Sequence, residues 1–340
     1  MSVAATAGCA LAALVLADAL SEALRRFALR RGLTDRPDLR KSHARPTPYL
    51  GGVAIAVGTL ASGCALVPHW DRRIGVIVAA SAAVAVLGLL DDIKSLNRAS
   101  RLMTEAIAAS AVVVCGGRIA VFGNWLDPVL TVVWIVVLTN SFNLLDNMDG
   151  AAAMVAFASA CFVAWAAYLA GQAGPALLLL SLSAGCLGFL VHNWAPARMF
   201  MGDAGSLFIG FVLSATIVMI HVPGGPAARI AELFLFTFVA TVDTCLVIIA
   251  RPRAGISWLA AGTDHASHRL RLIGLSVRQV GLTLFAATAL SCLCGVLVAY
   301  DRLPAIATLA AATAIAVTLI LLLLKVPAYA APNESSERPS

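Results

Sequence analysis

The chain has 340 residues, of which 60% are hydrophobic and 12% are charged, with a mean hydropathy of +0.90 and a formal net charge of +6. This composition excludes a soluble domain and is typical of a protein that crosses a membrane many times.

Windows of about 20 residues with few charges predict eleven membrane-spanning helices. In chain order they cover residues 3–24, 49–68, 74–90, 102–121, 127–146, 151–170, 175–192, 204–221, 229–250, 280–299 and 304–324. We therefore expect an all-α polytopic membrane protein with one integral domain over residues 1–331 and a disordered polar tail over residues 332–340. The N-terminus lacks the basic region and cleavage site of a secretory signal, so we expect that the first helix is not cleaved off.

The basic residues predict the orientation of these helices. With Met1 outside, the connections after the odd-numbered helices and the C-terminal segment carry 19 of the 24 Lys and Arg residues, and the other connections carry 5. Cytoplasmic loops are enriched in Lys and Arg. The asymmetry predicts an external N-terminus and a cytoplasmic C-terminus.

Acid, amide and imidazole side chains gather at the predicted cytoplasmic helix ends. They form four groups: Asp91 with Asp92, Asn140 to Asp149, Asp203, and His265 with His268. Transporters place such groups near the bilayer midplane on broken helices. Because these groups lie at helix ends on one side, they predict a site open to the cytosol rather than a path across the membrane.

Two of the groups are carboxylates at membrane boundaries. Asp203 opens an apolar run, and an ionised side chain buried there costs several kcal/mol unless a partner or an ion compensates it. Asp91 and Asp92 precede Lys94 and are able to hold a divalent cation, act as a general base or act as a nucleophile. The alternative for this pair is a helix end that simply meets water.

The other groups suit a nucleotide diphosphate. Asn143, Asp146 and Asp149 recur at close to helical spacing and offer oxygen ligands for Mg²⁺ and partners for a nucleotide. His265 and His268, followed by Arg269, suit a pyrophosphate, because its charge must be offset by cations and donors. A solvated helix end and a solvated basic loop are the respective alternatives, and a zinc site would need further ligands nearby.

A basic, proline-broken loop around Lys41, between the first two helices, is able to attract anionic headgroups and a phosphorylated lipid. The eight cysteines lie in or beside apolar runs without metal-binding spacing, so we interpret them as small core residues.

Together these motifs resemble the polyprenyl-phosphate N-acetylhexosamine-1-phosphate transferases, a glycosyltransferase family 4 type of enzyme. The resemblance runs from about Asp35 to Gln279. It rests on Arg40-Lys41-Ser42-His43 through Gly51-Gly52, on Asp91-Asp92, on Asn143 to Gly150, on Pro196 to Gly210 and on His265 to Leu270. Phe200-Met201-Gly202-Asp203-Ala204-Gly205-Ser206 is the most specific of these motifs.

The resemblance implies transfer of a sugar phosphate from a UDP-N-acetylhexosamine, with GlcNAc as the default sugar, to undecaprenyl or decaprenyl phosphate. UMP is released, and the reaction is the first membrane step of cell-envelope polysaccharide or lipopolysaccharide synthesis in the bacterial inner membrane. The lipid phosphate attacks the phosphorus next to the sugar, either directly, which we prefer, or after an aspartyl-phosphate intermediate. The expected partners are the UDP-sugar, the lipid carrier and the membrane, with a homodimer as a further possibility and no nucleic acid.

The resemblance also implies roles for individual residues. The implied catalytic residues are Asp91, Asp92, His265 and His268, and the implied Mg²⁺ ligand is Asp203, with Mn²⁺ as the alternative ion. The implied substrate-binding residues are Lys41, Asn143, Asp146, Asp149, Phe200 and Arg269. In this assignment Asp91 is the carboxylate closest to the lipid phosphate and Phe200 stacks on uracil.

Two positions depart from the family pattern. Asn147 stands where the family more often has Gly, and Ser267 stands in a motif that often carries three histidines. Arg269-Leu270 matches the branch that uses simple amino sugars, rather than the branch that uses UDP-MurNAc-pentapeptide. Fucosamine or quinovosamine donors, the muramoyl-pentapeptide donor and, from a different class, secondary transport remain the alternatives. The CDP-alcohol phosphotransferases fit worse, because Met154 replaces the Arg of their motif.

Overall fold

The computed structural model describes residues 3–35, 46–65, 70–220, 225–257 and 262–328. Lys41 and the tail over residues 332–340 lie outside these ranges. The described helices are α1 Val3–Arg31, α2 Gly51–Ala65, α3 Arg72–Lys94, α4 Arg98–Val114, α5 Leu126–Leu145, α6 Ala151–Leu169, α7 Ala173–Asn193, α8 Gly202–Met219, α9 Pro226–Phe236, α10 Phe238–Arg253, α11 Ala266–Leu272, α12 Val277–Ala299 and α13 Ala305–Leu324. One short antiparallel pair, β1 Thr34–Asp35 with β2 Thr47–Pro48, is the sheet within the described ranges.

The predicted all-α polytopic membrane fold is confirmed. In the described part of the chain, eight helices are long and apolar enough to cross a membrane, and a bent pair of helices makes a ninth candidate. α2 is apolar but has only 15 residues. The number of eleven spans and the orientation of the termini stay predictions.

Several predicted spans differ in form from the structure. The span predicted at 102–121 corresponds to α4, which ends at Val114. The span predicted at 229–250 is broken between α9 and α10, whose axes meet at 75°. At the break Thr237 donates its hydroxyl to the Leu233 carbonyl, a bond that competes with regular helix geometry. The first helix continues to Arg31, beyond its apolar run, and Glu22 pairs with Arg25 and Arg26 in this charged continuation. It ends at Gly32, whose φ is +69°.

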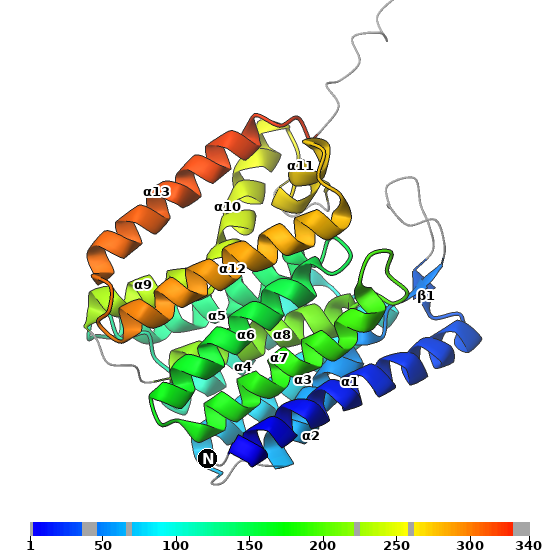
Figure 1. Cartoon of the computed structure of the whole chain (residues 1–340), viewed down its shortest axis with the longest axis horizontal. Coiled ribbons are helices and arrows are strands. Elements are labelled where there is room, and N and C mark those ends of the chain that lie inside the picture. Colours follow the sequence, from blue (N-terminus) through cyan, green and yellow to red (C-terminus); the bar gives the residue numbers. More distant parts are fainter. Residues whose placement is uncertain (1–2, 36–45, 66–69, 221–224, 258–261, 329–340) are drawn as a thin grey trace, which may run out of the picture.

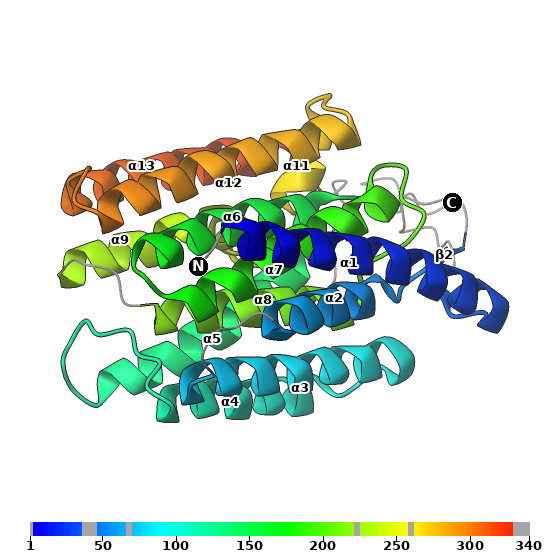
Figure 2. The same ribbon diagram turned by 60° about the horizontal axis from the view of Figure 1, so that its bottom comes forward.

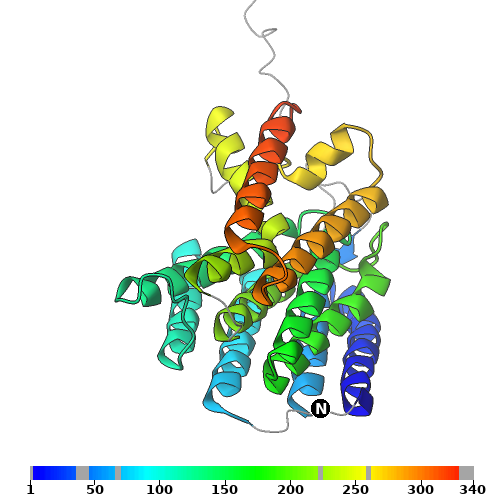
Figure 3. The ribbon, with the colours of Figure 1, turned by 60° about the vertical axis from the view of Figure 1, so that its left-hand side comes forward.

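The helices lie in layers. Figure 2 shows α12 and α13 on one side of the molecule, α3 and α4 on the other, and the remaining long helices between them. The earlier helices run side by side in Figure 1, whereas Figure 3 shows α10, α11 and the end of α13 extending beyond that bundle. This extension carries the histidine motif.

α8 is the central helix, and its packing positions Asp203. Every residue from Ala204 to Met219 is buried, because this helix is apolar or small on all sides. Glycines let its neighbours approach: a Cβ on Gly88 of α3 would lie 2.4 Å from the Asp203 carbonyl oxygen, and one on Gly52 of α2 would lie 2.0 Å from the Gly205 nitrogen. The start of α8 is therefore held tightly between α2 and α3.

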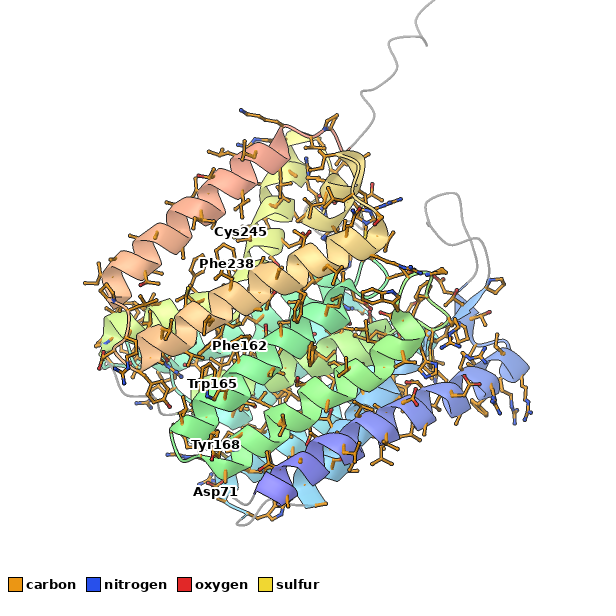
Figure 4. All side chains as sticks on the ribbon, in the orientation of Figure 1. Asp71, Phe162, Trp165, Tyr168, Phe238 and Cys245 are labelled. Carbon is orange, nitrogen blue, oxygen red and sulfur yellow. The ribbon has the colours of Figure 1, made fainter. Side chains whose placement is uncertain are left out.

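Aromatic side chains gather at the end of α6 that is distant from its Gly150 start. Trp165 and Tyr168 are exposed there, and Figure 4 shows them on the same side of the molecule as Asp71, at the start of α3. Trp and Tyr with exposed rings are typical of a membrane–water interface. The acidic residues discussed below lie at the opposite ends of α3 and α5 and at the start of α8.

Candidate active site

Arg101 brings three of the predicted site residues together. Its Nη1 donates to Asp91 Oδ2 at 2.8 Å and to Asp203 Oδ2 at 3.0 Å. Its Nη2 donates to Asn140 Oδ1 at 3.3 Å and to Asn143 Oδ1 at 3.5 Å. One guanidinium thus binds the end of α3, the start of α8 and one face of α5.

Asn143 fixes the second oxygen of Asp203. Its Nδ2 donates to Asp203 Oδ1 at 2.7 Å and to Ser206 Oγ at 2.9 Å. Because the amide nitrogen faces two acceptors, the carbonyl oxygen of the same side chain is turned toward Arg101. We call Asp91, Arg101, Asn143 and Asp203 the acidic cluster.

Glu105 adds a third carboxylate next to Arg101. It is fully buried, one helical turn after Arg101, with its Oε1 3.8 Å from Arg101 Nε. Its other oxygen accepts a hydrogen bond from Asn140 Nδ2. Around one guanidinium the structure therefore places three carboxyl groups, from Asp91, Glu105 and Asp203. A second cation or protonation of a carboxyl would balance them.

Asp92 occupies a different place from Asp91. Its carboxylate accepts hydrogen bonds from the backbone N–H groups of Asp203 at 2.8 Å and Ala204 at 3.0 Å. These are two of the first free donors of α8, so Asp92 caps that helix and interacts favourably with its dipole. The arrangement holds the start of α8, and with it Asp203, against α3.

The residues of the acidic cluster fit a magnesium ion. Mg²⁺ is bound through one or two carboxylates, with waters and substrate phosphates completing an oxygen shell. Asp91 and Asp203 converge on one cationic group, and the Asn143 amide lies beside them. Within the described residues no group of three Asp, Glu, His or Cys side chains is arranged to hold a metal alone, so the substrate would have to supply ligands.

The turn between α5 and α6 is tied to the loop before α8. Asp149 Oδ2 accepts a hydrogen bond from the Ala197 N–H at 2.9 Å. Asn193 Oδ1 accepts one from Gly150 N at 2.9 Å, and its Nδ2 donates to the Met199 carbonyl at 2.9 Å. Gly150 has a φ of +74°, which only a residue without a Cβ adopts readily. These bonds place the turn and the loop against each other.

Asp146 begins this turn, next to the acidic cluster. Burial, reinforced by the negative charges of Asp203, Asp92 and Asp149, raises the pKa of Asp146 to about 7. A carboxyl with such a pKa marks the turn as part of the same electrostatic site and is typical of functional clusters.

Phe200 is anchored through its backbone. Its N–H donates to the Pro48 carbonyl at 2.7 Å, and its carbonyl accepts from Gly51 N at 3.0 Å. Met201 accepts in the same way from Gly52 N at 2.8 Å. The end of the proline-broken loop and the most specific motif of the sequence are therefore in direct contact.

The histidine motif is held by Asp243. Its carboxylate accepts from Ala266 N at 2.7 Å and lies 2.8 Å from His265 Nδ1, so the buried His265 ring is oriented and its Nε2 is left as the outer nitrogen. Arg251 Nη2 lies 3.5 Å from that Nε2. The His268 ring lies 6.2 Å from the His265 ring, and burial lowers the pKa of His268.

Arg269 lies against the last helix. Its Nε donates to the Asp264 carbonyl at 2.9 Å, and its Nη1 donates to the carbonyls of Leu323 and Val326. The described contacts of this guanidinium thus join α11 to the end of α13. The described polar contacts of the His265 ring are with Asp243 and Arg251, and none is with the acidic cluster.

Three residues of the site were missed in the sequence. Arg101 was counted only as one of the basic residues that set the topology, and Glu105 lay inside a predicted span. Asp243 lay inside the span predicted at 229–250, and the structure shows that it orients His265. A charged residue inside an apolar helix was the available signal for Glu105 and Asp243.

Comparisons with known proteins identify the family of this chain. The family described as glycosyl transferase family 4 matches residues 74–221, which run from the start of α3 past the end of α8 and contain the acidic cluster. A Bacillus subtilis protein named "Probable undecaprenyl-phosphate N-acetylglucosaminyl 1-phosphate transferase" is 32% identical, over 77% of this chain and 76% of its own length. The chain belongs to glycosyl transferase family 4. The predicted resemblance is confirmed.

Other relatives represent two branches of this family. The Mycolicibacterium smegmatis decaprenyl-phosphate N-acetylglucosaminephosphotransferase is 31% identical, over 77% of this chain and 74% of its own. The Moorella thermoacetica phospho-N-acetylmuramoyl-pentapeptide-transferase is 32% identical, over 62% of this chain and 73% of its own.

Proposed function

We propose that this member of glycosyl transferase family 4 transfers N-acetylhexosamine 1-phosphate, with GlcNAc as the default sugar, from a UDP-sugar to undecaprenyl or decaprenyl phosphate and releases UMP. The observation that carries the proposal is the acidic cluster, in which Arg101 joins Asp91, Asn143 and Asp203 at one end of a membrane bundle. The names of the relatives supply the substrate classes.

The setting suits a lipid acceptor and a soluble donor. The cluster lies at helix ends, where a phosphate headgroup at the membrane surface and a nucleotide from solution are both able to arrive. The bacterial sources of the relatives support an inner-membrane location, and the distribution of Lys and Arg supports an orientation with this end facing the cytoplasm. Transport is less well supported, because the polar residues gather at one end of the bundle.

Mg²⁺ is the proposed cofactor, and it would be held by Asp203 and Asp91 with help from Asn143. When bound, it offsets negative charge on the diphosphate of the donor. Arg101 lies between the same two carboxylates and holds them in a fixed relative position. Glu105, near Arg101 Nε, and Asn140, which accepts a hydrogen bond from Arg101 Nη2, orient the guanidinium.

The transfer itself needs positioning more than a strong base. An oxygen of the lipid phosphate attacks the phosphorus that bears the sugar, and the bond from that phosphorus to the UMP oxygen breaks. A phosphate monoester is largely dianionic at neutral pH, so its oxygen is already a nucleophile. In direct attack Asp91 positions the acceptor or removes its residual proton, and Asp92 keeps α8 in place.

The donor would occupy the space bounded by the α5–α6 turn, the loop before α8 and α11. In this arrangement Asp146 and Asp149 lie on the nucleotide side, and Phe200 provides a ring for uracil. His265 and His268 meet the diphosphate, and Asp243 keeps the His265 ring in one orientation.

Release of UMP by the purified protein tests the proposal. The protein in detergent is given undecaprenyl phosphate, Mg²⁺ and a panel of donors: UDP-GlcNAc, UDP-N-acetylfucosamine, UDP-N-acetylquinovosamine and UDP-MurNAc-pentapeptide. We expect release with a simple UDP-amino sugar, and none without lipid or with EDTA. Release with the pentapeptide donor alone would move the chain to the muramoyl branch, and no release by folded protein with any donor would overturn the proposal.

A further inference from the structure

Ser267 and Asn147, the two departures from the family pattern, contact each other. The Ser267 hydroxyl donates to Asn147 Oδ1, although 120 residues separate them in the chain. The other end of the Asn147 amide is also held, because its Nδ2 donates to the Leu144 carbonyl at 2.7 Å. A glycine at position 147 would have no side-chain oxygen to accept this hydrogen bond. The two unusual residues are therefore hydrogen-bond partners of each other.

The bond is partly buried. Ser267 is 2% exposed, whereas Asn147 is of intermediate exposure. Asn147→Ala would therefore leave the buried Ser267 hydroxyl without this acceptor, and a buried polar group that loses its partner costs free energy. The pair therefore constrains the two segments that carry it.

Those two segments bear the two halves of the proposed donor site. Asn147 lies in the α5–α6 turn, between Asp146 and Asp149, and Ser267 lies in the first turn of α11, between His265 and His268. α11 has seven residues, too short to be stable alone, so its position depends on its anchors. Asp243 accepts a hydrogen bond from Ala266 N, and Asn147 accepts one from the Ser267 hydroxyl, both in the first turn of α11.

We propose that Asn147 and Ser267 form a positioning pair that sets the separation between the histidine pair and the α5–α6 turn, and so adapts the donor site to its UDP-sugar. The inference rests on the proposed function. The pair connects the α5–α6 turn with α11, both on the proposed nucleotide side of the site. It has no described contact with Asp91 or Arg101, on the proposed acceptor side. Its loss therefore alters the use of the donor and leaves the use of the lipid unchanged.

A double-mutant cycle tests the pair. Initial rates are measured for wild type, Ser267→Ala, Asn147→Ala and the double variant, with the UDP-sugar varied at saturating lipid and then the reverse. We expect each single variant to lower kcat/KM for the donor by about tenfold, the size of one hydrogen bond. The double variant should lose about tenfold as well, rather than about a hundredfold, because each change removes the same bond.

Two controls separate positioning from general damage. Ser267→Thr keeps the hydroxyl and should recover most of the loss in donor kcat/KM that Ser267→Ala shows. Ser110→Ala removes a hydroxyl that bonds only the backbone of its own exposed helical turn, and it should change neither substrate's parameters. Multiplicative losses in the double variant, or equal losses for donor and lipid together with a lower unfolding temperature, would overturn the proposal.

Binding of UDP, measured by calorimetry on the same four proteins, distinguishes failure of this inference from failure of the proposed function. If the wild type transfers no sugar but the cycle in UDP affinity is non-additive, the positioning pair stands and the transferase does not. If the wild type transfers sugar and Ser267→Ala matches it in every parameter, the transferase stands and the pair does not. If the wild type neither binds UDP nor transfers sugar, both fall.

Discussion

At the residue scale, Arg101 is the side chain that connects the other residues of the acidic cluster. Its planar fork donates to two carboxylates and two amides from three helices. A lysine carries the same charge, but as a compact ammonium without that fixed geometry. The site therefore depends on the shape of this side chain as well as on its charge.

We predict that Arg101→Lys lowers kcat/KM by about 10²-fold, because a lysine cannot hold both carboxylates and both amides in place and a displacement of the site by about 1 Å has an effect of this size. Folding should be largely retained, since a cation remains among Asp91, Glu105 and Asp203. UMP release and the unfolding temperature in detergent are the two measurements. Wild-type turnover in this variant would remove Arg101 from the proposed mechanism.

Asp203 is the second decisive residue. Asp203→Asn preserves the volume of the side chain and removes the negative charge proposed to bind Mg²⁺, so we predict a loss of about 10³-fold in kcat with the fold intact. Asp301→Asn is the matched control: Asp301 is exposed in the turn after α12, where its φ of 54° suits Asn equally well. Substantial Mg²⁺-dependent activity in the Asp203 variant would contradict the metal assignment.

At the scale of elements, glycine contacts determine where the acidic cluster forms. α8 is buried over its whole length after Asp203, and its start is pressed against α2 and α3 where Gly52 and Gly88 leave room. Asp92 adds a helix cap at the same point. Close backbone packing and capping together fix the direction in which Asp203 points.

We predict that Gly88→Ala is destabilising and lowers activity, because the new Cβ would lie 2.4 Å from a backbone oxygen of Asp203 and cannot move away by a change of rotamer. Gly75→Ala, in the same helix, is the matched control. A Cβ there meets nothing within 4 Å, and Ala favours the helix by about 1 kcal/mol over Gly. Unfolding temperatures in detergent compare the two variants, and equal effects would show that helix propensity rather than packing decides.

At the scale of the whole molecule, the bundle has two chemically different ends. The acidic cluster, the α5–α6 turn and the start of α8 share one end, while exposed Trp165 and Tyr168 lie toward the other. α10 and α11 extend beyond the bundle (Figure 3) and carry Asp243 and the histidines. The proposed donor site thus combines the bundle with this extension.

We predict that the C-terminus faces the cytoplasm. A green fluorescent protein fused after Ser340 should fluoresce, and alkaline phosphatase fused at the same position should be inactive in intact bacterial cells. The predicted eleven spans place 19 of the 24 Lys and Arg residues on the side shared with that terminus. Active phosphatase would reverse the orientation and place the acidic cluster outside.

The sequence by itself determined the membrane class, most helix positions and the motifs of the site, because hydropathy and helical spacing are properties of neighbouring residues. It also indicated that Asp203 needed a partner. Which partner it has was decided by the tertiary structure: Arg101 lies 102 positions away and was indistinguishable from any other basic residue near a helix end.

The same reason explains the other differences. Asp91 and Asp92 are adjacent and chemically identical, yet packing turns one toward Arg101 and the other toward the backbone of α8. Asn147 and Ser267 were separate irregularities in the sequence and became a bonded pair in the structure. Local patterns determine which helices form, whereas the contacts between distant helices decide which polar groups neutralise one another, because a buried charge or donor must find its partner wherever the fold places it.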